Sequence, residues 1–433
     1  MGKAFLIYRV LRCVEIKFIT ISEDKKKLLS NFFSLTVLQI FTYLLPLLTL
    51  PYLTRVLGAE RFGAVVFAQS FIMFFNVLVD YGFNLYATRE ISIHRDNEKK
   101  VLEIFSSVMI IKVFLVVVSL LALTAIVFTF DRFLDDVELY YLTFFWVFGQ
   151  ALFPIWYFQG MEQMKYVTIV NVVAKIIFTV LIFALVRNPG DYYKVPILNG
   201  FGMCAGACLS LVILRIVHNQ GFGFYRFGVL QQHFRESSQF FLSRFSVAIY
   251  TTSNTFVIGL FSSNDAAGYY SIADKLYQAL QQIYHPVVQS LYPYVAKQKN
   301  IAFFKKIFKV SVFLNFGCIA LLFCVGEYVF SSLFTETVGK ESLEVFYILL
   351  FAALVVVPSM LLGYPFLGAL GFGVHANASV VFGSVFHLSG LGVLVLVGDV
   401  TIYSIAYMVV ATELLVLVYR IYWVKSGLLW LRR

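Results

Sequence analysis

Four cationic side chains lie inside long apolar stretches of the sequence, where a charge is costly. They are Lys112, Lys175, Arg244 and Lys275. Ionisable residues at bilayer depth usually face a water-filled cavity or a partner. Arginine binds phosphate through a fork of donors, and lysine acts as a movable point charge. We therefore interpret the four residues as candidate ligands of a polyanion such as pyrophosphate. The alternative is that their apolar stems extend the charges to the membrane surface.

Three carboxylates form a second candidate set, for ion coupling. They are Asp80, Asp274 and Glu413. A carboxylate within the membrane can bind a proton or a sodium ion and couple a gradient to a conformational change. Asp274 and Lys275 are adjacent, so they point to different faces of a helix and are not expected to pair. Asp80 falls near the end of its apolar stretch, where a structural salt bridge is the competing interpretation.

The sequence contains no arrangement typical of catalysis or of metal binding. Its five cysteines form no CxxC pair and its six histidines form no HExxH pattern, so neither a thiol redox motif nor a zinc site is indicated. We predict no catalytic residues, no metal site and no cofactor, and therefore no enzyme. An ion gradient of H⁺ or Na⁺ is the expected driving force.

The composition requires a membrane environment for these residues. Of 433 residues, 60% are hydrophobic and 13% are charged, and the mean hydropathy is +0.83. Soluble domains have roughly 25% charged residues, so this chain has too little polar surface to remain in water. We predict an all-α integral membrane protein. The net charge of +10 fits basic loops that face anionic lipid, and no nucleic-acid partner is expected.

Apolar stretches of membrane-spanning length recur along most of the chain. A spanning helix needs about 20 mostly apolar residues. We predict about twelve spans, at residues 29–54, 62–84, 104–129, 139–160, 167–186, 195–217, 238–261, 267–294, 308–332, 343–366, 374–397 and 400–424. They group into an N-terminal six-helix bundle (29–217) and a C-terminal six-helix bundle (238–424). A cytoplasmic lead-in (1–28), a cytoplasmic linker (218–237) and a cytoplasmic tail (425–433) complete the predicted organisation.

The distribution of basic residues predicts the orientation. If the N-terminus is cytoplasmic, 24 of the 34 Lys and Arg residues fall in inside segments and 6 fall in outside loops. Cytoplasmic loops are enriched in Lys and Arg. Both termini are therefore predicted to be cytoplasmic, which is consistent with an even number of spans.

The two halves of the chain resemble each other. The stretch AERFG at residues 59–63 precedes the second span, and NDAAG at 264–268 precedes the eighth, with the acid and the glycine in register. Six spans per half make the repeat parallel. Transporters with this organisation bind substrate between the bundles and expose it alternately to each side.

Helix breakers and aromatic residues are abundant in the predicted spans. Eight of the nine prolines lie inside them, and each removes a hydrogen bond and can kink a helix. Such kinks could gate a cavity or could only shape static packing. Most Tyr and Trp residues are expected at the membrane interface. A few in a cavity could stack on sugar rings, and the sequence does not indicate which.

Five motifs resemble those of a known transporter family. They are PLLTLPYLTRVLGAERFG (46–63), DYGFNLYATRE (80–90), PIWYFQGMEQM (154–164), YSIADKL (270–276) and QSLYP (289–293). Together they resemble the O-antigen-type oligosaccharide flippases of the polysaccharide transporter family, within the multidrug/oligosaccharidyl-lipid/polysaccharide exporter superfamily. The resemblance covers residues 28–300 clearly and the remainder by architecture.

This resemblance implies a function in O-antigen and lipopolysaccharide biosynthesis. Members of the family move undecaprenyl-pyrophosphate-linked repeat units from the inner to the outer leaflet of the bacterial inner membrane. Related exporters have two six-helix bundles around a central cationic cavity and work by alternating access. The implied partners are the lipid-linked oligosaccharide, membrane lipids, and the polysaccharide polymerase with its chain-length machinery.

Two other functions are compatible with the same sequence. An ion-coupled small-molecule or drug antiporter on this scaffold would depend on the cavity acids rather than on the cations. A membrane-embedded polysaccharide polymerase would need a large outside loop for substrate. The acidic outer cluster of Asp131, Asp135, Asp136 and Glu138 lies on a short loop, which is most simply a solvated helix connection.

Overall fold

A computed structural model describes residues 23–430, and within them the side chains of all but 23–38, 40, 43, 242–244, 246–248 and 427–430. Most of the predicted lead-in therefore lies outside the described residues. The described chain is helical and contains no strand. The first group of helices is α2 (Glu23–Asp80), α3 (Phe83–Ile93), α4 (Glu98–Thr129), η1 (Asp131–Asp136), α5 (Val137–Leu152), α6 (Ile155–Gly160), α7 (Met164–Leu185), η2 (Pro189–Tyr193) and α8 (Lys194–Val217). The second is α9 (Phe227–Phe261), α10 (Asn264–Gln298), α11 (Ile301–Leu333), α12 (Glu336–Leu362), η3 (Gly363–Gly368), α13 (Gly373–Val397) and α14 (Ile402–Trp430).

Helix α2 forms two membrane crossings. It has 58 residues and turns back at Gly58, whose φ of 77° and ψ of 169° lie outside the helical region. At 1.5 Å per residue it is about 87 Å long, more than twice the roughly 30 Å hydrocarbon core. A left-handed φ is readily adopted by glycine because it has no Cβ. The two legs of α2 correspond to the first two predicted spans.

The number of crossings agrees with the prediction of about twelve. Nine stretches of the described residues are long and apolar enough to span a membrane, and one of them, Leu44–Ile93, includes the turn at Gly58. Helices α9 and α10 are not among the nine, although each has 35 residues. At 1.5 Å per residue each is about 52 Å long, which is enough to cross the membrane. The chain is therefore a multi-pass, all-α membrane protein.

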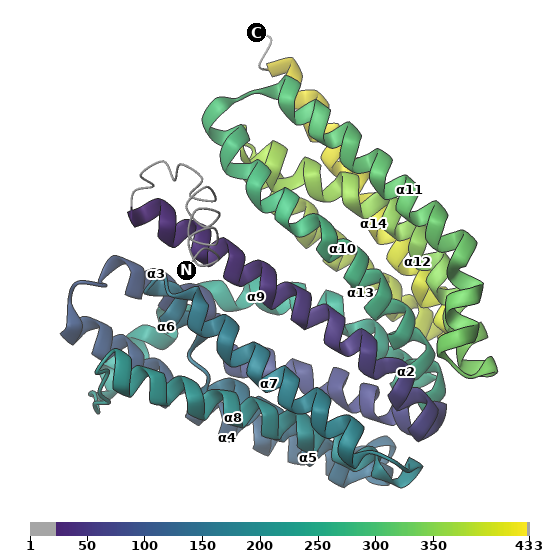
Figure 1. Cartoon of the computed structure of the whole chain (residues 1–433), viewed down its shortest axis with the longest axis horizontal. Coiled ribbons are helices and arrows are strands. Elements are labelled where there is room, and N and C mark those ends of the chain that lie inside the picture. The colour runs from purple at the N-terminus through teal and green to yellow at the C-terminus, as the bar shows by residue number, and fades with distance from the viewer. Residues whose placement is uncertain (1–22, 431–433) are drawn as a thin grey trace, which may run out of the picture.

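The helices form two bundles that diverge in a V (Figure 1). The first six crossings form one bundle, and α10 to α14 form most of the other, with α9 running between them. We call the end at which α2 begins and α14 ends the terminal end, and the opposite end, where the bundles meet, the Gly58 end. Residues 227–237, expected in the cytoplasmic linker, are the first turns of α9.

The bundles meet at the Gly58 end through the two repeat-related motifs. A Cβ built on Gly63 of α2 would lie 1.8 Å from the carbonyl oxygen of Asn264, and one on Gly268 of α10 would lie 3.3 Å from that of Ala59. Arg132 of η1 closes the same end, since its Nη2 donates to the Gly259 carbonyl at 2.7 Å and to Asn264 Oδ1 at 2.6 Å. The predicted parallel repeat is therefore visible as two glycine-containing segments that pack against each other.

Candidate substrate cleft between the two bundles

Three connected cavities lie where the bundles face each other. The N-bundle chamber has a volume of about 420 Å³, the inter-bundle compartment about 330 Å³, and the Asp80 compartment about 280 Å³. The first two share Trp146 and Lys275 in their walls, and the last two share Met73. We call the three together the central cleft. Ligand sites commonly have volumes of about 300–1,000 Å³.

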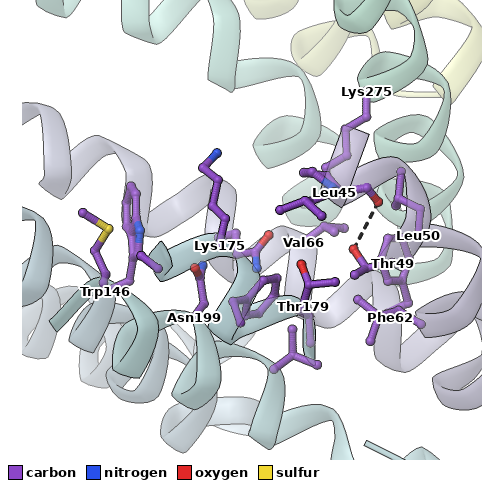
Figure 2. Close-up of a pocket in the computed structure, with 18 of the residues that line it drawn as sticks. Leu45, Thr49, Leu50, Phe62, Val66, Trp146, Lys175, Thr179, Asn199 and Lys275 are labelled. Atoms are coloured by element: carbon purple, nitrogen blue, oxygen red, sulfur yellow. Dashed lines mark hydrogen bonds between the residues drawn. The ribbon is translucent and has the colours of Figure 1, made fainter. Parts of the chain in front are cut away.

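The N-bundle chamber brings together two of the predicted cations. Its walls come from α2, α5, α7 and α8, with Lys275 reaching in from α10. Figure 2 shows Lys175 and Trp146 on one side of the chamber and Lys275 entering from the α10 side. The Lys275 ammonium lies 5.9 Å from the centre of the Phe62 ring. Among the described side chains that line this chamber, Lys175 and Lys275 are the charged ones, so together they make its field positive.

The inter-bundle compartment contains the predicted carboxylate Asp274. Gln278 Nε2, one turn further along α10, donates a hydrogen bond of 2.7 Å to Asp274 Oδ2. Lys275 lines the same compartment. The ion pairs shorter than 4.0 Å in the described part of the chain include none between Asp274 and Lys275. Each of these two charges therefore faces the cavity beside the other rather than being bound to it.

The Asp80 compartment contains two more of the predicted residues. Asp80 at the end of α2 and Lys112 of α4 both line it, and they attract each other electrostatically. Lys112 is only 3% exposed, so it faces the bundle interior and not lipid. A buried cation next to a carboxylate is stabilised by that partner. The structure therefore supports a bundle ion pair as well as a ligand site at this position.

Of the remaining two predicted residues, Glu413 lies outside this cleft. Glu413 of α14 lies within the second bundle, where Tyr250 Oη donates to its Oε1 at 2.8 Å, and it lines none of the three cavities. Arg244 belongs to α9, but its side chain is outside the described residues.

A buried polar network in the second bundle was not predicted. Arg420 is one of the 24 basic residues that the orientation prediction counts in inside segments. It lies instead in the interior of the second bundle, where it is 8% exposed and donates to the Ser359 carbonyl at 2.7 Å and to Ser379 Oγ at 2.9 Å. A signal was available, because Arg420 follows Glu413 by seven residues and so occupies the same helix face. The two side chains attract each other.

His387 of α13 completes this network. It is fully buried, and its Nε2 lies 2.7 Å from Asn254 Oδ1 of α9 while its Nδ1 lies 3.0 Å from Thr412 Oγ1 of α14. One side chain thus joins three helices of the second bundle. The histidines are scattered along the chain and show no spacing pattern, so His387 could not be selected from the sequence.

Uncharged polar side chains in the cleft were also missed. Gln69, Gln150 and Asn199 line the N-bundle chamber together with Trp146. They belong to α2, α5 and α8, so no local pattern in the sequence relates them. Only the fold places them together.

A second set of contacts joins the bundles outside the membrane span. At the start of α9, the hydroxyl of Tyr86 donates to Glu236 and lies 2.8 Å from His233 Nδ1. The bond from Tyr86 holds the pKa of Glu236 below its usual value. Burial, followed by the charge of Lys100, lowers the pKa of His233. We call these residues the terminal-end junction.

Comparison with known proteins identifies relatives. Residues 28–299 match a family model described as polysaccharide biosynthesis protein. The chain is 29% identical over 275 residues to a protein of Escherichia coli strain K12 named "Putative O-antigen transporter", and 28% identical over 265 residues to one of Shigella dysenteriae with the same name. These matches cover 63% and 61% of this chain. Each covers 66% of the relative, slightly less than two thirds of its length.

Two solved transporters share the fold. An inward-facing multidrug resistance transporter of the MATE family and MOP superfamily aligns with a TM-score of 0.66 at 12% identity, covering 91% of this chain and 97% of that one. The lipid II flippase MurJ in an inward closed conformation aligns with a TM-score of 0.64 at 13% identity, covering 90% and 87%. Such low identities show the common fold alone.

Proposed function

Because the chain belongs to the polysaccharide biosynthesis protein family, we propose that it is a flippase for undecaprenyl-pyrophosphate-linked oligosaccharide repeat units of the O-antigen type. The membrane would be the bacterial inner membrane. Support comes from the names of the two relatives and from the fold shared with a lipid II flippase. The family and the fold contain transporters, and the proposed activity moves a lipid without making or breaking a covalent bond.

The observation on which this proposal depends is the meeting of Lys175 and Lys275 in one cavity. A diphosphate cannot enter hydrocarbon unless something replaces its hydration. Two ammonium groups in a chamber without carboxylates supply that replacement, and lysine follows a moving phosphate as a flexible point charge. A cation-selective drug antiporter would instead need acids in this chamber.

The V shape supports an alternating-access mechanism. With the orientation that the basic loops predict, the terminal end is cytoplasmic and both termini are on that side. The structure then represents a state that is closed at the periplasmic Gly58 end and diverges toward the cytoplasm (Figure 1). The repeat unit would enter the cleft from the inside while its prenyl chain stays in lipid. Opening of the Gly58 end would release it on the outer side.

We assign the driving force to an H⁺ or Na⁺ gradient. Among the three predicted coupling residues, Asp274 is best placed, because it lines the same compartment as the substrate ligand Lys275. Binding of a cation by Asp274 changes the net charge that a diphosphate meets there. Asp80 and Glu413 each have another partner, in Lys112 and Tyr250. The polymerase and its chain-length machinery remain proposed partners.

Side-specific enzymatic labelling tests the proposal. Purified protein in liposomes would be given undecaprenyl-pyrophosphate N-acetylglucosamine, and a soluble galactosyltransferase would label only the sugar exposed on its own side. We expect the Lys175→Gln, Lys275→Gln double variant to reduce translocation by at least about tenfold, because a charge-assisted hydrogen bond is worth roughly 1.5–3 kcal/mol. Lys340→Gln removes an exposed charge and serves as the matched control. Wild-type translocation in the double variant would exclude this site.

A further inference from the structure

A group of uncharged side chains at the centre of the cleft has no assigned role in holding a diphosphate. It consists of Trp146 and Gln150 of α5, Gln69 of α2 and Asn199 of α8. Trp146 and Gln150 are four residues apart and therefore share one helix face. Figure 2 shows Trp146 and Asn199 on the same side of the chamber as Lys175.

This group lies where the three cavities join. Trp146, Gln69 and Asn199 line both the N-bundle chamber and the inter-bundle compartment. Gln150 lines both the chamber and the Asp80 compartment. A molecule that moves from the N-bundle chamber into either of the other two compartments therefore passes at least one of the four side chains. Their position therefore suits selection of what passes.

The three amides are not used by the protein itself. All three are half-buried, and among the described residues none of them has a hydrogen-bond partner. Because no described protein group occupies their donors and acceptors, these amides can pair with a ligand or with ordered water in the cavity. An amide offers both donors and an acceptor, so three of them complement a ligand rich in hydroxyl or acetamido groups.

The indole of Trp146 is also without an aromatic partner among the described residues. It is half-buried, unlike Trp156, which is fully buried in the core of the first bundle. An aromatic face presents negative charge density, which suits the apolar, slightly positive C–H face of a sugar ring. The sequence indicated that some cavity aromatic could do this, and the structure selects Trp146.

The charge of the chamber further restricts which sugars can bind there. Among the described side chains, Lys175 and Lys275 line it and no carboxylate does. The carboxylate of the adjoining inter-bundle compartment, Asp274, accepts a hydrogen bond from Gln278. A sugar with a free amine would bring a third ammonium group close to these two, and like charges in a confined cavity repel. An N-acylated or hydroxyl-bearing ring has no such cost. The chamber therefore discriminates by charge as well as by hydrogen bonding.

We propose that Trp146, Gln69, Gln150 and Asn199 form a saccharide subsite that binds the sugar ring next to the diphosphate and selects neutral or N-acylated sugars over amino sugars. This inference rests on the proposed function, since it takes the diphosphate on Lys175 and Lys275 as its reference point. The aromatic ring stacks against the sugar, and the amides form hydrogen bonds with its substituents. A site built to pair with hydroxyl groups rejects ligands that lack them.

Equilibrium binding to the purified protein in lipid nanodiscs tests the subsite. Three probes are compared: undecaprenyl diphosphate without sugar, the same lipid bearing N-acetylglucosamine, and the same lipid bearing glucosamine. We expect the N-acetylated probe to bind at least about fivefold more tightly than the other two. Trp146→Ala should weaken binding of the N-acetylated probe about tenfold, because one ring contact and its buried area are lost. The affinity for the sugar-free lipid should change by less than about twofold. Trp146→Phe should retain most of the affinity.

Two control variants separate the outcomes. Phe148→Ala removes an exposed aromatic ring two residues along the same helix and should change no affinity. Lys175→Gln should weaken the sugar-free and the N-acetylated probes by the same factor, and the glucosamine probe by less, because the variant also removes part of the repulsion of its amine. If the lysine variant has no effect, the proposed function fails at its diphosphate site. If the lysine behaves as expected but Trp146→Ala weakens the sugar-free lipid equally, or weakens none, the saccharide subsite is overturned and the diphosphate site stands.

Discussion

Gly63 is the position at which a single added methyl group should most directly alter transport. In the closed Gly58 end, a Cβ at this residue would lie 1.8 Å from the backbone oxygen of Asn264, whereas ordinary contact begins at 3.4 Å. The obstacle is backbone, so no side chain can rotate away. In Gly63→Ala, α2 and α10 must therefore separate locally by about 1.6 Å, the difference between these two distances.

The expected size of the effect follows from the cost of overpacking. Extra carbon atoms in a closely packed contact cost about 1–3 kcal/mol. Each 1.4 kcal/mol changes an equilibrium about tenfold, so the closed form should lose roughly 5- to 150-fold in population relative to forms open at the Gly58 end. Transport should fall because the closed arrangement is needed to load substrate from the terminal side.

Cysteine accessibility measures this shift. In a background without the five native cysteines, Ser271→Cys places a thiol on the wall of the inter-bundle compartment. A membrane-impermeant maleimide applied from the Gly58 side should label it about tenfold faster in Gly63→Ala than with Gly63. Gly317→Ala is the matched control, since a Cβ there meets no atom within 4 Å. Equal labelling rates in the two alanine variants would refute the argument that this contact holds the end closed.

Two further predictions concern stability, measured as the Tm of the purified protein. Burial lowers the pKa of His233, so the unfolded chain binds a proton at this residue more tightly than the folded protein does, and stability falls as pH drops below about 6.5. The Tm should therefore decrease from pH 8 to 5.5, with a smaller decrease in His233→Gln and the wild-type decrease in the control His94→Gln. The same decrease in all three proteins would contradict this prediction. Arg420→Met leaves two buried serine acceptors without a donor and should cost about 2–3 kcal/mol, visible as a Tm several degrees lower, whereas the exposed Lys425→Met should be neutral.

The membrane fold could be predicted because it follows from local composition. Apolar stretches of about 20 residues must form helices in lipid, where every backbone group needs an internal partner. The turn at Gly58 was also visible, since a glycine followed by charged residues separated two apolar stretches. The start of α9 at Phe227 could not be predicted. Residues 227–237 are polar, and they are helical because Tyr86 and Tyr81 of the first bundle pack against them.

The candidate site was predictable only where it contains charge. Lys175 and Lys275 stand out in apolar sequence because an uncompensated charge in lipid is costly. Whether they meet depends on how α2, α5, α7, α8 and α10 dock, which no local pattern encodes. Gln69 and Asn199 are ordinary residues in sequence, and their role depends on being left unpaired beside a cavity. The opposite error was made at Arg420. This charge near a helix end was expected to face solvent, whereas it donates hydrogen bonds to Ser359 and Ser379 in the interior of the second bundle.

The docking of the bundles also determines how strongly the cleft can bind an anion. Lys175 belongs to α7 of the first bundle and Lys275 to α10 of the second, and α10 touches α2 at the Gly63 contact. Separation at the Gly58 end moves α10 away from the first bundle and thereby separates the two ammonium groups. The field of a pair of charges weakens as their distance from the ligand grows. Affinity for a diphosphate must then be lower in the outward form than in the inward one.

That difference is what a transporter requires. A ligand shifts a conformational equilibrium only by as much as its affinities for the two states differ. Two lysines on one bundle would bind a diphosphate equally in both states and would neither load nor release it selectively. One lysine on each bundle makes the binding site itself dependent on conformation. The double variant Lys275→Gln, Asn199→Lys moves the second cation into the first bundle. It should therefore preserve diphosphate binding but abolish translocation. Continued translocation would show that the division of charge between the bundles is irrelevant.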